Sequence, residues 1–403
     1  GWLQSGRTRI KRMAGVTEYS KRDRLQSKAS AGSVADPDRP ASLTRQKARR
    51  KFGYATDFHS NLTGERPMQI SLDALQTLIA AAFENSKVDP ETAQIVAKAL
   101  VRAEADGISS HGVARVPPYA EQAKCGKVDG FARPTMTRPR PGVINVDSHI
   151  GFAFPAVELG LREGSKAALE TGVAAVGFAH SHHFGAAGHH VEDAADAGLV
   201  AMAFSNTPSA IAPWGGSRAL YGTNPIAFAW PRAGRAPMVI DLSVSTVARG
   251  KVTLAAKAGA PIPADWAFDA DGNPTTDAQA ALSGSMAPLG GAGAGAKGAA
   301  LALMVELLCG ALTGSNFGYQ GTSFFEPTGA PPSIGHMMLL FDPAAFGGAD
   351  SFGDRAEELF GEILAQDGAR LPGDRRLKLR EAAARDGVSI PDALLDDIKS
   401  RAS

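Results

Sequence analysis

Cysteine is scarce in this chain, because only Cys125 and Cys309 occur among 403 residues, far apart and outside any paired motif. Their isolation gives no support to a disulfide framework or a cysteine-based zinc site, and it suits a reducing cytoplasm. Long apolar runs are also missing, since no stretch approaches the roughly 20 residues that a membrane-spanning helix needs. With 44% hydrophobic and 21% charged residues, the composition predicts a soluble globular protein without a membrane partner.

The net charge of +1 is unevenly distributed along the chain. Residues 1–67 hold 15 Lys and Arg against 6 Asp and Glu, which leaves 27 against 35 for residues 68–403. This basic head has no sustained apolar period, which predicts a disordered or loosely attached extension. We interpret it first as translated sequence upstream of a natural start at Met68. A transit peptide and a nucleic-acid-binding tail are the alternatives.

Helical and strand patterns alternate through the rest of the chain. An apolar period over residues 72–83 predicts a helix, and Asp89 and Pro90 predict the cap and first residue of a second helix. Short apolar runs bounded by Gly, Pro and Asn predict strands at GVAAVGF, LVAMAFSN, NPIAFAWP, PMVIDLS and HMMLLFDP. Further helices are predicted at HHVEDAADAG, AALALMVELLCGAL (buried), DRAEELFGEILAQ, DRRLKLREAAARDG and PDALLDDI. These patterns predict an α+β fold in which helices from both ends pack together around an inserted α+β region.

A dinucleotide-binding fingerprint, G-x-G-x-x-G, is matched by GAGAKG at residues 293–298. A true fingerprint follows a strand and opens the helix of an early βαβ unit. The preceding SGSMAPLGGAGA is no strand, and an Ala/Gly-rich stretch produces the match by chance. Lys297 is a separate matter, because a lysine at a helix start in a glycine-rich loop is either a phosphate ligand or a solvated side chain.

Two further stretches carry residues suited to catalysis. In SSHGVARVPPY, His111 and Arg115 are four apart, so a helix would place them on one face, where Arg115 could grip a carboxylate. A surface arginine and a satisfied core histidine are the alternative. HSHHFGAAGHH holds five of the nine histidines between His180 and His190. Three roles are possible for these histidines: metal ligand, acid/base and structural residue. The local spacing disfavours a compact metal site.

Six blocks, in this order and spacing, resemble the malate/L-lactate dehydrogenase family, which is distinct from the Rossmann lactate and malate dehydrogenases. They are SSHGVARVPPY, SHHFGAAG, APWGGSRALYGTNPIAFAWP, MVIDLSVSTVARGKV, WAFDADGNPTTDAQAAL and GAKGAALALMVELLCGALTG. The family also contains ureidoglycolate, sulfolactate and diketogulonate enzymes and reductases of piperideine- and pyrroline-2-carboxylate. The resemblance runs from Met68 to the C-terminus, and the basic head lies outside it.

The resemblance implies a non-Rossmann nicotinamide-cofactor domain with a mixed, largely antiparallel sheet, beside a helical domain built from both chain ends. The implied segments are 1–67 (extension), 68–140 (N-terminal helical), 141–345 (cofactor-binding and catalytic) and 346–403 (C-terminal helical). A homodimer that binds NAD or NADP and a small carboxylate substrate is implied as well. Neither a metal nor a nucleic-acid partner is expected.

Site residues are implied at the matching positions. His183 corresponds to the acid/base, and Ser110, His111 and Arg115 correspond to the substrate side. Cofactor contacts fall on Thr207, Asp241, Leu242, Ser243, Lys297, Arg355, Gly373, Asp374 and Arg375. The Gly/Ala stretch before Lys297 is longer than the family pattern.

The implied reaction is hydride transfer between nicotinamide and a small 2-hydroxy or 2-oxo acid of sulfolactate, malate or lactate type, catalysed by an NAD(P)-dependent 2-hydroxyacid dehydrogenase. The blocks look most similar to a sulfolactate dehydrogenase-like branch. The alternative is an NADPH-dependent reductase of cyclic 2-imino acids. Sulfolactate needs a second anion site, for which Arg218, Arg232 and Arg249 are the candidates.

Overall fold

The structure is a computed structural model that describes residues 68–348 and 350–403. The interpretations of the basic head concern residues 1–67 and lie outside this range. No helix within the described residues is long and apolar enough to cross a membrane.

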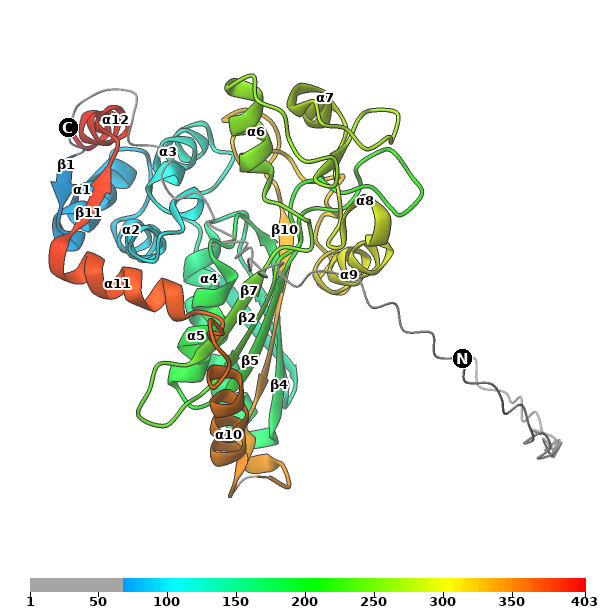
Figure 1. Cartoon of the computed structure of the whole chain (residues 1–403). Helices are drawn as coiled ribbons and strands as arrows, with labels where there is room; N and C mark the ends of the chain where they lie inside the picture. The colour runs from blue at the N-terminus through cyan, green and yellow to red at the C-terminus, as the bar shows by residue number, and fades with distance from the viewer. Residues whose placement is uncertain (1–67, 349) are drawn as a thin grey trace, which may run out of the picture. The chain divides into compact units, whose positions relative to one another are not determined.

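Helices from both ends of the chain share one hydrophobic core. Helix α1 packs against α2 and α12, and the short strand β1 pairs antiparallel with β11 (Figure 1). The core contains residues such as Leu75 and Leu100 from the first helices and Leu395 and Ile398 from the last. The elements are β1 (Met68–Ile70), α1 (Leu72–Glu84), α2 (Pro90–Ala105), α3 (Val116–Cys125), α11 (Asp374–Asp386), β11 (Val388–Ile390) and α12 (Asp392–Ala402).

The predicted start of α2 is confirmed in detail. The Asp89 carboxylate accepts hydrogen bonds from the backbone N–H groups of Glu91 and Thr92, and Pro90 is the first helical residue. Asp89 therefore satisfies donors that a helix start otherwise leaves free, while proline loses nothing at a position without an intrahelical partner.

A seven-stranded, mostly antiparallel sheet forms the centre of the described chain. Its order is β2-β3-β4-β10-β5-β6-β7, and only β3 and β4 run parallel. The strands are β2 (Thr135–Arg140), β3 (Val143–Asp147), β4 (Val173–Ser181), β5 (Val200–Ser205), β6 (Ile226–Trp230), β7 (Met238–Leu242) and β10 (Ile334–Phe341). The five predicted strands and the mixed, largely antiparallel sheet are thus confirmed.

Alternation along the strands separates the two faces of this sheet. Met338 and Leu340 of β10 face a core that includes α4 (Ala153–Thr171) and α5 (Ala187–Asp196). Met337, directly before Met338, packs on the other face with Val305 and Cys309.

The run AALALMVELLCGAL, predicted to be a buried helix, is helical but only partly buried. It lies in α9 (Ala296–Glu306) and a following π-helical turn (Leu307–Ala311). Ala302, Val305 and Cys309 are buried, whereas the exposed fractions of Leu303, Leu307 and Leu312 are 44%, 52% and 68%. The expectation of burial was wrong. In an amphipathic helix the polar residues show which side faces solvent, but this run is apolar on all sides, so its sequence does not show which side is exposed.

The chance interpretation of GAGAKG agrees with its surroundings. The stretch spans the end of α8 (Gly291–Ala294) and the start of α9, and the strand before it, β9 (Ser285–Met286), has only two residues. A third core joins this region to β8 (Ala267–Phe268), α6 (Arg249–Lys257) and α7 (Ala278–Ser283).

A buried ionic cluster connects α11 to α2 and α5. Arg380 Nε lies 2.6 Å from Asp106 Oδ1, and Arg376 Nη1 lies 2.7 Å from Glu192 Oε2. Both carboxylates are buried. Burial alone would raise their pKa values, but hydrogen bonds, chiefly from the two arginines, outweigh it; they hold the pKa of Asp106 well below its usual range and that of Glu192 at about 2. The cluster lies at the C-terminal end of α2, directly before the segment that carries Ser110 and His111.

Candidate active site

Two short 3-10 turns, Ser109–His111 and Val113–Arg115, connect α2 to α3 and carry the predicted substrate-side residues. The α-helix that would place His111 and Arg115 on one face is absent, because the backbone of Gly112 between the turns is not helical (φ −98°, ψ −133°). Gly112 packs so closely on Glu104 that a Cβ there would lie 2.3 Å from Oε2. The Glu104 carboxylate also accepts hydrogen bonds from Ser109 Oγ (2.7 Å) and the Val113 N–H (2.9 Å). The Glu104 carboxylate, to which no sequence motif pointed, therefore shapes this segment.

Arg115 presents a free edge of its guanidinium group. Its Nε donates a 2.7 Å hydrogen bond to the Ser110 carbonyl, and its guanidinium carbon lies 4.4 Å from the centre of the Phe325 ring. Its Nη1 is buried and has no hydrogen-bond partner among the described residues. A buried donor without a partner is costly, and a guanidinium edge matches a carboxylate. The site is thus chemically suited to a carboxylate ligand.

His111 and His183 lie against each other beside Arg115. Their rings are stacked with centroids 5.2 Å apart, and His111 Nδ1 is 3.0 Å from Ser110 Oγ. Burial and the charge of Arg115 lower the pKa of His111 to about 3. The same two causes hold the pKa of His183 well below its usual value. Both rings are therefore neutral at physiological pH in this state.

Tyr119, in α3, fixes the His183 ring. Its hydroxyl is hydrogen-bonded to His183 Nδ1, and its side chain is fully buried. Tyr119 is the last residue of SSHGVARVPPY, and no sequence pattern assigned it a role. Burial raises the pKa of Tyr119 and keeps the hydroxyl protonated, so it can either donate to Nδ1 or accept from Nδ1–H.

The other four histidines of HSHHFGAAGHH have separate partners. His180 Nδ1 lies 3.1 Å from Asp147, and His182 Nε2 lies 2.7 Å from Gln122 Oε1. His189 Nε2 lies 2.8 Å from the Asp106 carboxylate, and His190 Nε2 lies 2.7 Å from the Phe184 carbonyl. Over residues 68–348 and 350–403, no three His, Cys, Asp or Glu side chains converge as metal ligands. Of the five, only His183 joins the His111 and Arg115 group.

Several predicted cofactor residues lie around β7. Asp241, near its end, accepts a 2.8 Å hydrogen bond from the N–H of Gly188 in the first turn of α5, just after His183. Leu242 is exposed, and Ser243 Oγ lies 3.0 Å from Ser245 Oγ. A Cβ on Gly373 would lie 3.4 Å from the Val239 carbonyl, so the Gly373–Asp374–Arg375 start of α11 also lies beside β7.

Arg355 projects from α10 (Phe352–Leu364), which Glu357 links to Arg232 through two hydrogen bonds of 2.6 and 2.8 Å. This pairing engages Arg232, one of the three candidates for a second anion site. Arg218 is exposed, and the guanidinium of Arg249 donates to the carbonyls of Ser209 and Leu282 at 3.4 Å.

The remaining predicted cofactor residues lie near opposite ends of α9, Lys297 at its start and Thr207 beside the residues that bond to Glu306 at its end. Lys297 is exposed in the first turn, which has no side-chain cap. Thr207 Oγ1 accepts a 3.0 Å hydrogen bond from the Thr223 N–H, and the Thr207 N–H donates to Asn224 Oδ1. An uncapped helix N-terminus with a lysine is suited to a phosphate group.

Glu306 holds the segments around Thr207 together. Its buried carboxylate accepts hydrogen bonds from the Asn206 and Asn224 side-chain amides and from the N–H groups of Gly222 and Gly318, at 2.9 to 3.1 Å. The sequence held a signal for this role, since a lone carboxylate inside the apolar run AALALMVELLCGAL requires buried partners. No comparable signal pointed to Phe324, whose ring centre lies 4.8 Å from that of His183.

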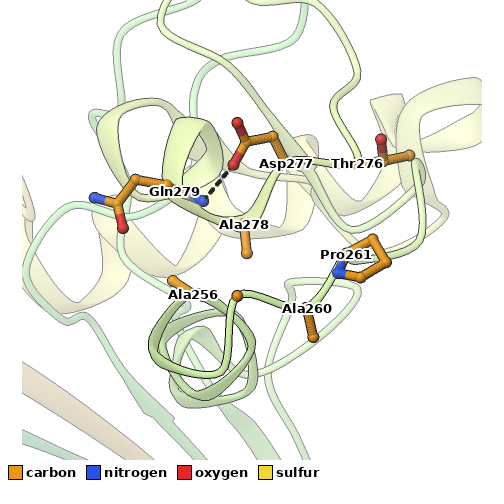
Figure 2. Close-up of a pocket in the computed structure, with 8 residues that line it drawn as sticks. Ala256, Ala260, Pro261, Thr276, Asp277, Ala278 and Gln279 are labelled. Atoms are coloured by element: carbon orange, nitrogen blue, oxygen red, sulfur yellow. Dashed lines mark hydrogen bonds between the residues drawn. The ribbon is translucent and has the colours of Figure 1, made fainter.

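A surface hollow lies elsewhere, between the end of α6 and the start of α7 (Figure 2). Ala256, Pro261 and Ala278 line it, together with Asp277, which caps α7 by accepting a hydrogen bond from the Gln279 N–H. None of the predicted site residues lines this hollow.

Comparison with known proteins agrees with this geometry. Residues 70–399 match the malate/L-lactate dehydrogenase family. A (2R)-3-sulfolactate dehydrogenase (NADP(+)) of Chromohalobacter salexigens is 53% identical over 333 residues, which cover 83% of this chain and 98% of the relative. A Delta(1)-pyrroline-2-carboxylate reductase of Pseudomonas fluorescens is 41% identical over 332 residues, covering 82% and 97%.

Among solved structures, the delta1-piperideine-2-carboxylate reductase of Pseudomonas syringae matches with a TM-score of 0.77 and 36% identity, covering 83% of this chain and 99% of that one. Both the family match and these relatives extend over nearly all of the described residues. The chain belongs to the malate/L-lactate dehydrogenase family.

Proposed function

We propose that this protein is an NAD(P)-dependent oxidoreductase that transfers a hydride between nicotinamide and a small 2-hydroxy or 2-oxo acid. The observation that carries the proposal is the partnerless Nη1 of buried Arg115 beside the stacked rings of His111 and His183. Such a group offers an anion site and an acid/base within one cluster. Family membership and the names of the relatives support the same reaction class.

In this proposal Arg115 orients the substrate carboxylate. Because Nε is already bonded to the Ser110 carbonyl, the Nη1 and Nη2 edge is the part that faces the ligand. Ser110 and His111 add hydroxyl and imidazole hydrogen-bonding groups next to it. Fixing the carboxylate brings the 2-carbon into a defined position, which is the usual contribution of such a clamp.

His183 acts as the acid/base. It donates a proton to the carbonyl oxygen when the 2-oxo acid is reduced and takes a proton from the hydroxyl in the reverse direction. Because the Tyr119 hydroxyl can donate or accept, it keeps the ring in place while Nδ1 changes its hydrogen-bonding role. Carboxylate binding at Arg115 neutralises a positive charge close to His183 and raises its pKa, which favours the protonated acid in the complex.

The cofactor would be held by the residues around β7 and the start of α9, and when bound it supplies or accepts the hydride. The uncapped α9 N-terminus with Lys297 suits a phosphate, and Gly373 places the start of α11 beside the backbone of β7. The proposed contacts are Thr207, Asp241, Leu242, Ser243, Lys297, Arg355, Gly373, Asp374 and Arg375. The name of the Chromohalobacter relative favours NADP over NAD.

Within the 2-hydroxy acids, we favour sulfolactate over malate and lactate, because the 53% identical relative is named a (2R)-3-sulfolactate dehydrogenase. Arg218 and Arg249 remain the candidates for its sulfonate, since Arg232 is paired with Glu357. Reduction of cyclic 2-imino acids is the second candidate, because other relatives are named for pyrroline- and piperideine-2-carboxylate.

We further propose that the helical segments 68–140 and 346–403 act as one domain beside the cofactor-binding segment 141–345. We also propose that the protein is a cytoplasmic homodimer. The core shared by both chain ends supports the first proposal, and the exposed leucines of α9 and the turn after it offer apolar surface that a second copy could cover. Light scattering of the purified protein tests the dimer.

The function is tested by following nicotinamide absorbance with purified protein, NADH or NADPH, and sulfopyruvate, oxaloacetate, pyruvate or piperideine-2-carboxylate. Oxidation of the cofactor with one of the three 2-oxo acids supports the proposal and selects the substrate branch. Turnover of the cyclic imine alone selects the second candidate, and no oxidation with any of them refutes both.

A further inference from the structure

The loop of residues 322–330, between α9 and β10, is tied into a closed shape although it has no regular secondary structure. At its base, Thr322 Oγ1 donates a 2.7 Å hydrogen bond to the Ala330 carbonyl. Near its tip, the Phe325 N–H donates to Ser323 Oγ at 3.1 Å. Compact surface loops whose ends lie close together commonly carry function.

A buried lysine holds the tip of this loop. Lys127 follows α3 and is only 2% exposed. Its Nζ donates hydrogen bonds to the carbonyls of Ser323 (2.8 Å), Glu326 (2.8 Å) and Thr328 (3.0 Å). These bonds use all three protons of the ammonium group. The carbonyl dipoles of the loop offset the cost of burying the ammonium charge. In turn, Lys127 holds the loop backbone in place at three residues.

Gln122 joins the same loop to the histidine segment. Its Nε2 donates to the Glu326 carbonyl at 3.0 Å, while its Oε1 lies 2.7 Å from Nε2 of His182, the neighbour of His183. Cys125 Sγ adds a hydrogen bond to the Pro327 carbonyl. The loop position is thus coupled both to α3 and to the turn that carries His183.

Two consecutive aromatic residues of the loop face the proposed reaction groups. Phe324 is buried, and its ring centre lies 4.8 Å from that of His183 and 5.5 Å from that of His182. Phe325 is 64% exposed, and its ring covers one face of the Arg115 guanidinium at 4.4 Å. Because a carboxylate binds in the guanidinium plane, a ring stacked on the guanidinium face leaves the buried Nη1 edge without a partner and borders it with an apolar wall.

We propose that the 322–330 loop is the substrate-side wall of the site, in which Phe325 determines how large a 2-substituent the bound acid can carry, with Lys127 as the positioning residue. This inference rests on the proposed function, because it assumes that Arg115 binds the acid carboxylate. A wall fixed at three carbonyls cannot yield to a longer side chain without breaking hydrogen bonds of the Lys127 ammonium group. It also excludes water from the face of Arg115, which strengthens the attraction to a carboxylate.

The test compares Phe325→Ala and Lys127→Met with the unchanged protein on the straight-chain acids pyruvate, 2-oxobutyrate and 2-oxovalerate. Phe346→Ala, at a half-exposed phenylalanine after β10, and Lys124→Met, at an exposed lysine of α3, are the matched controls. Each acid is assayed for reduction and is also titrated calorimetrically into protein saturated with NADP+, which cannot reduce it. The titration measures acid binding without turnover.

For Phe325→Ala we expect the ratio of 2-oxovalerate to pyruvate, both in kcat/KM and in affinity, to rise about tenfold relative to the unchanged protein. This is the effect of one or two methylene groups in a tight pocket. For Lys127→Met we expect the same direction of change, a higher KM, and faster chymotryptic cleavage after Phe325, with partial recovery in Lys127→Arg. Neither control should shift the ratio between the acids.

If the unchanged protein reduces these acids but the length ratio in Phe325→Ala stays the same, this inference fails and the proposed function stands. If the unchanged protein reduces or binds none of these acids, and neither sulfopyruvate nor oxaloacetate, the proposed function fails and the inference falls with it. If it reduces sulfopyruvate or oxaloacetate and neither it nor Phe325→Ala binds any straight-chain acid, only the inference fails. Should Lys127→Met not fold, the result for Phe325→Ala, a change at an exposed side chain, still decides the role of the wall.

Discussion

The Tyr119 hydroxyl is hydrogen-bonded to Nδ1 of His183, although the two residues lie 64 positions apart in the chain. Tyr119 is in α3, whereas His183 follows strand β4 of the sheet. The contact therefore links the helical segment that carries Arg115 to the segment that carries the proposed acid/base.

Replacement of Tyr119 by phenylalanine removes this hydrogen bond while keeping the ring in its core position. We expect kcat to fall about 10- to 100-fold, because the His183 ring loses a fixed partner worth about 1.5–3 kcal/mol. Cofactor affinity, followed by the fluorescence of bound NADPH, should stay unchanged. Tyr319→Phe, at an exposed tyrosine, is the control. An unchanged kcat would show that Tyr119 only fills the core.

Replacement of Arg115 by lysine keeps the charge but loses the planar fork. We expect KM for the 2-oxo acid to rise about 10- to 100-fold, since a lysine cannot bond both to the Ser110 carbonyl and bidentately to a carboxylate. Steady-state kinetics measure this change, and Arg133→Lys, at an exposed ion pair, serves as the control. A KM equal to that of the unchanged protein would refute the carboxylate clamp.

The pH dependence of reduction should differ between kcat and kcat/KM. Reduction requires protonated His183, so both rates fall as the pH rises through the relevant pKa. In the free protein, burial and the charge of Arg115 lower the pKa of His183. A bound carboxylate cancels that charge, so the pKa seen in kcat should be higher than the pKa seen in kcat/KM. Profiles with the opposite order would contradict the proposed pairing of Arg115 and His183.

Replacement of Arg380 by alanine removes one of the positive charges that offset the buried negative charges of Asp106 and Glu192. We expect the free energy of unfolding to fall by about 3 kcal/mol at neutral pH, as measured by urea denaturation. Arg385→Ala, at an exposed pair on the same helix, should have little effect.

The destabilisation should shrink in acid. Both carboxylates have lowered pKa values in the folded state, so the stability they contribute is present above the unfolded pKa near 4 and is lost as the pH falls toward the folded values. The difference between the unchanged protein and Arg380→Ala should therefore decrease from neutral pH to about pH 3. A constant difference would mean that Arg380 stabilises α11 by packing alone.

Local chemistry accounts for what could be predicted before the structure. The cap at Asp89, the proline after it and the β-forming runs depend on neighbours within one helical turn or one strand, and each was located correctly. The blocks around Ser110, His111, Arg115 and His183 likewise identified the family. An all-apolar run has no alternation between apolar and polar residues to show which side is buried. The burial of α9 was mispredicted for this reason.

By itself the sequence determined where the elements begin, which residues carry reactive groups and which family they belong to, because these properties reside in side chains and their near neighbours. Only the tertiary structure decided that β10 lies between β4 and β5, that Tyr119 meets His183, and that Lys127 holds a loop about 200 positions away. Those contacts result from the packing of surfaces distant in the chain, whose pairing depends on shape and burial and is not written in any local pattern.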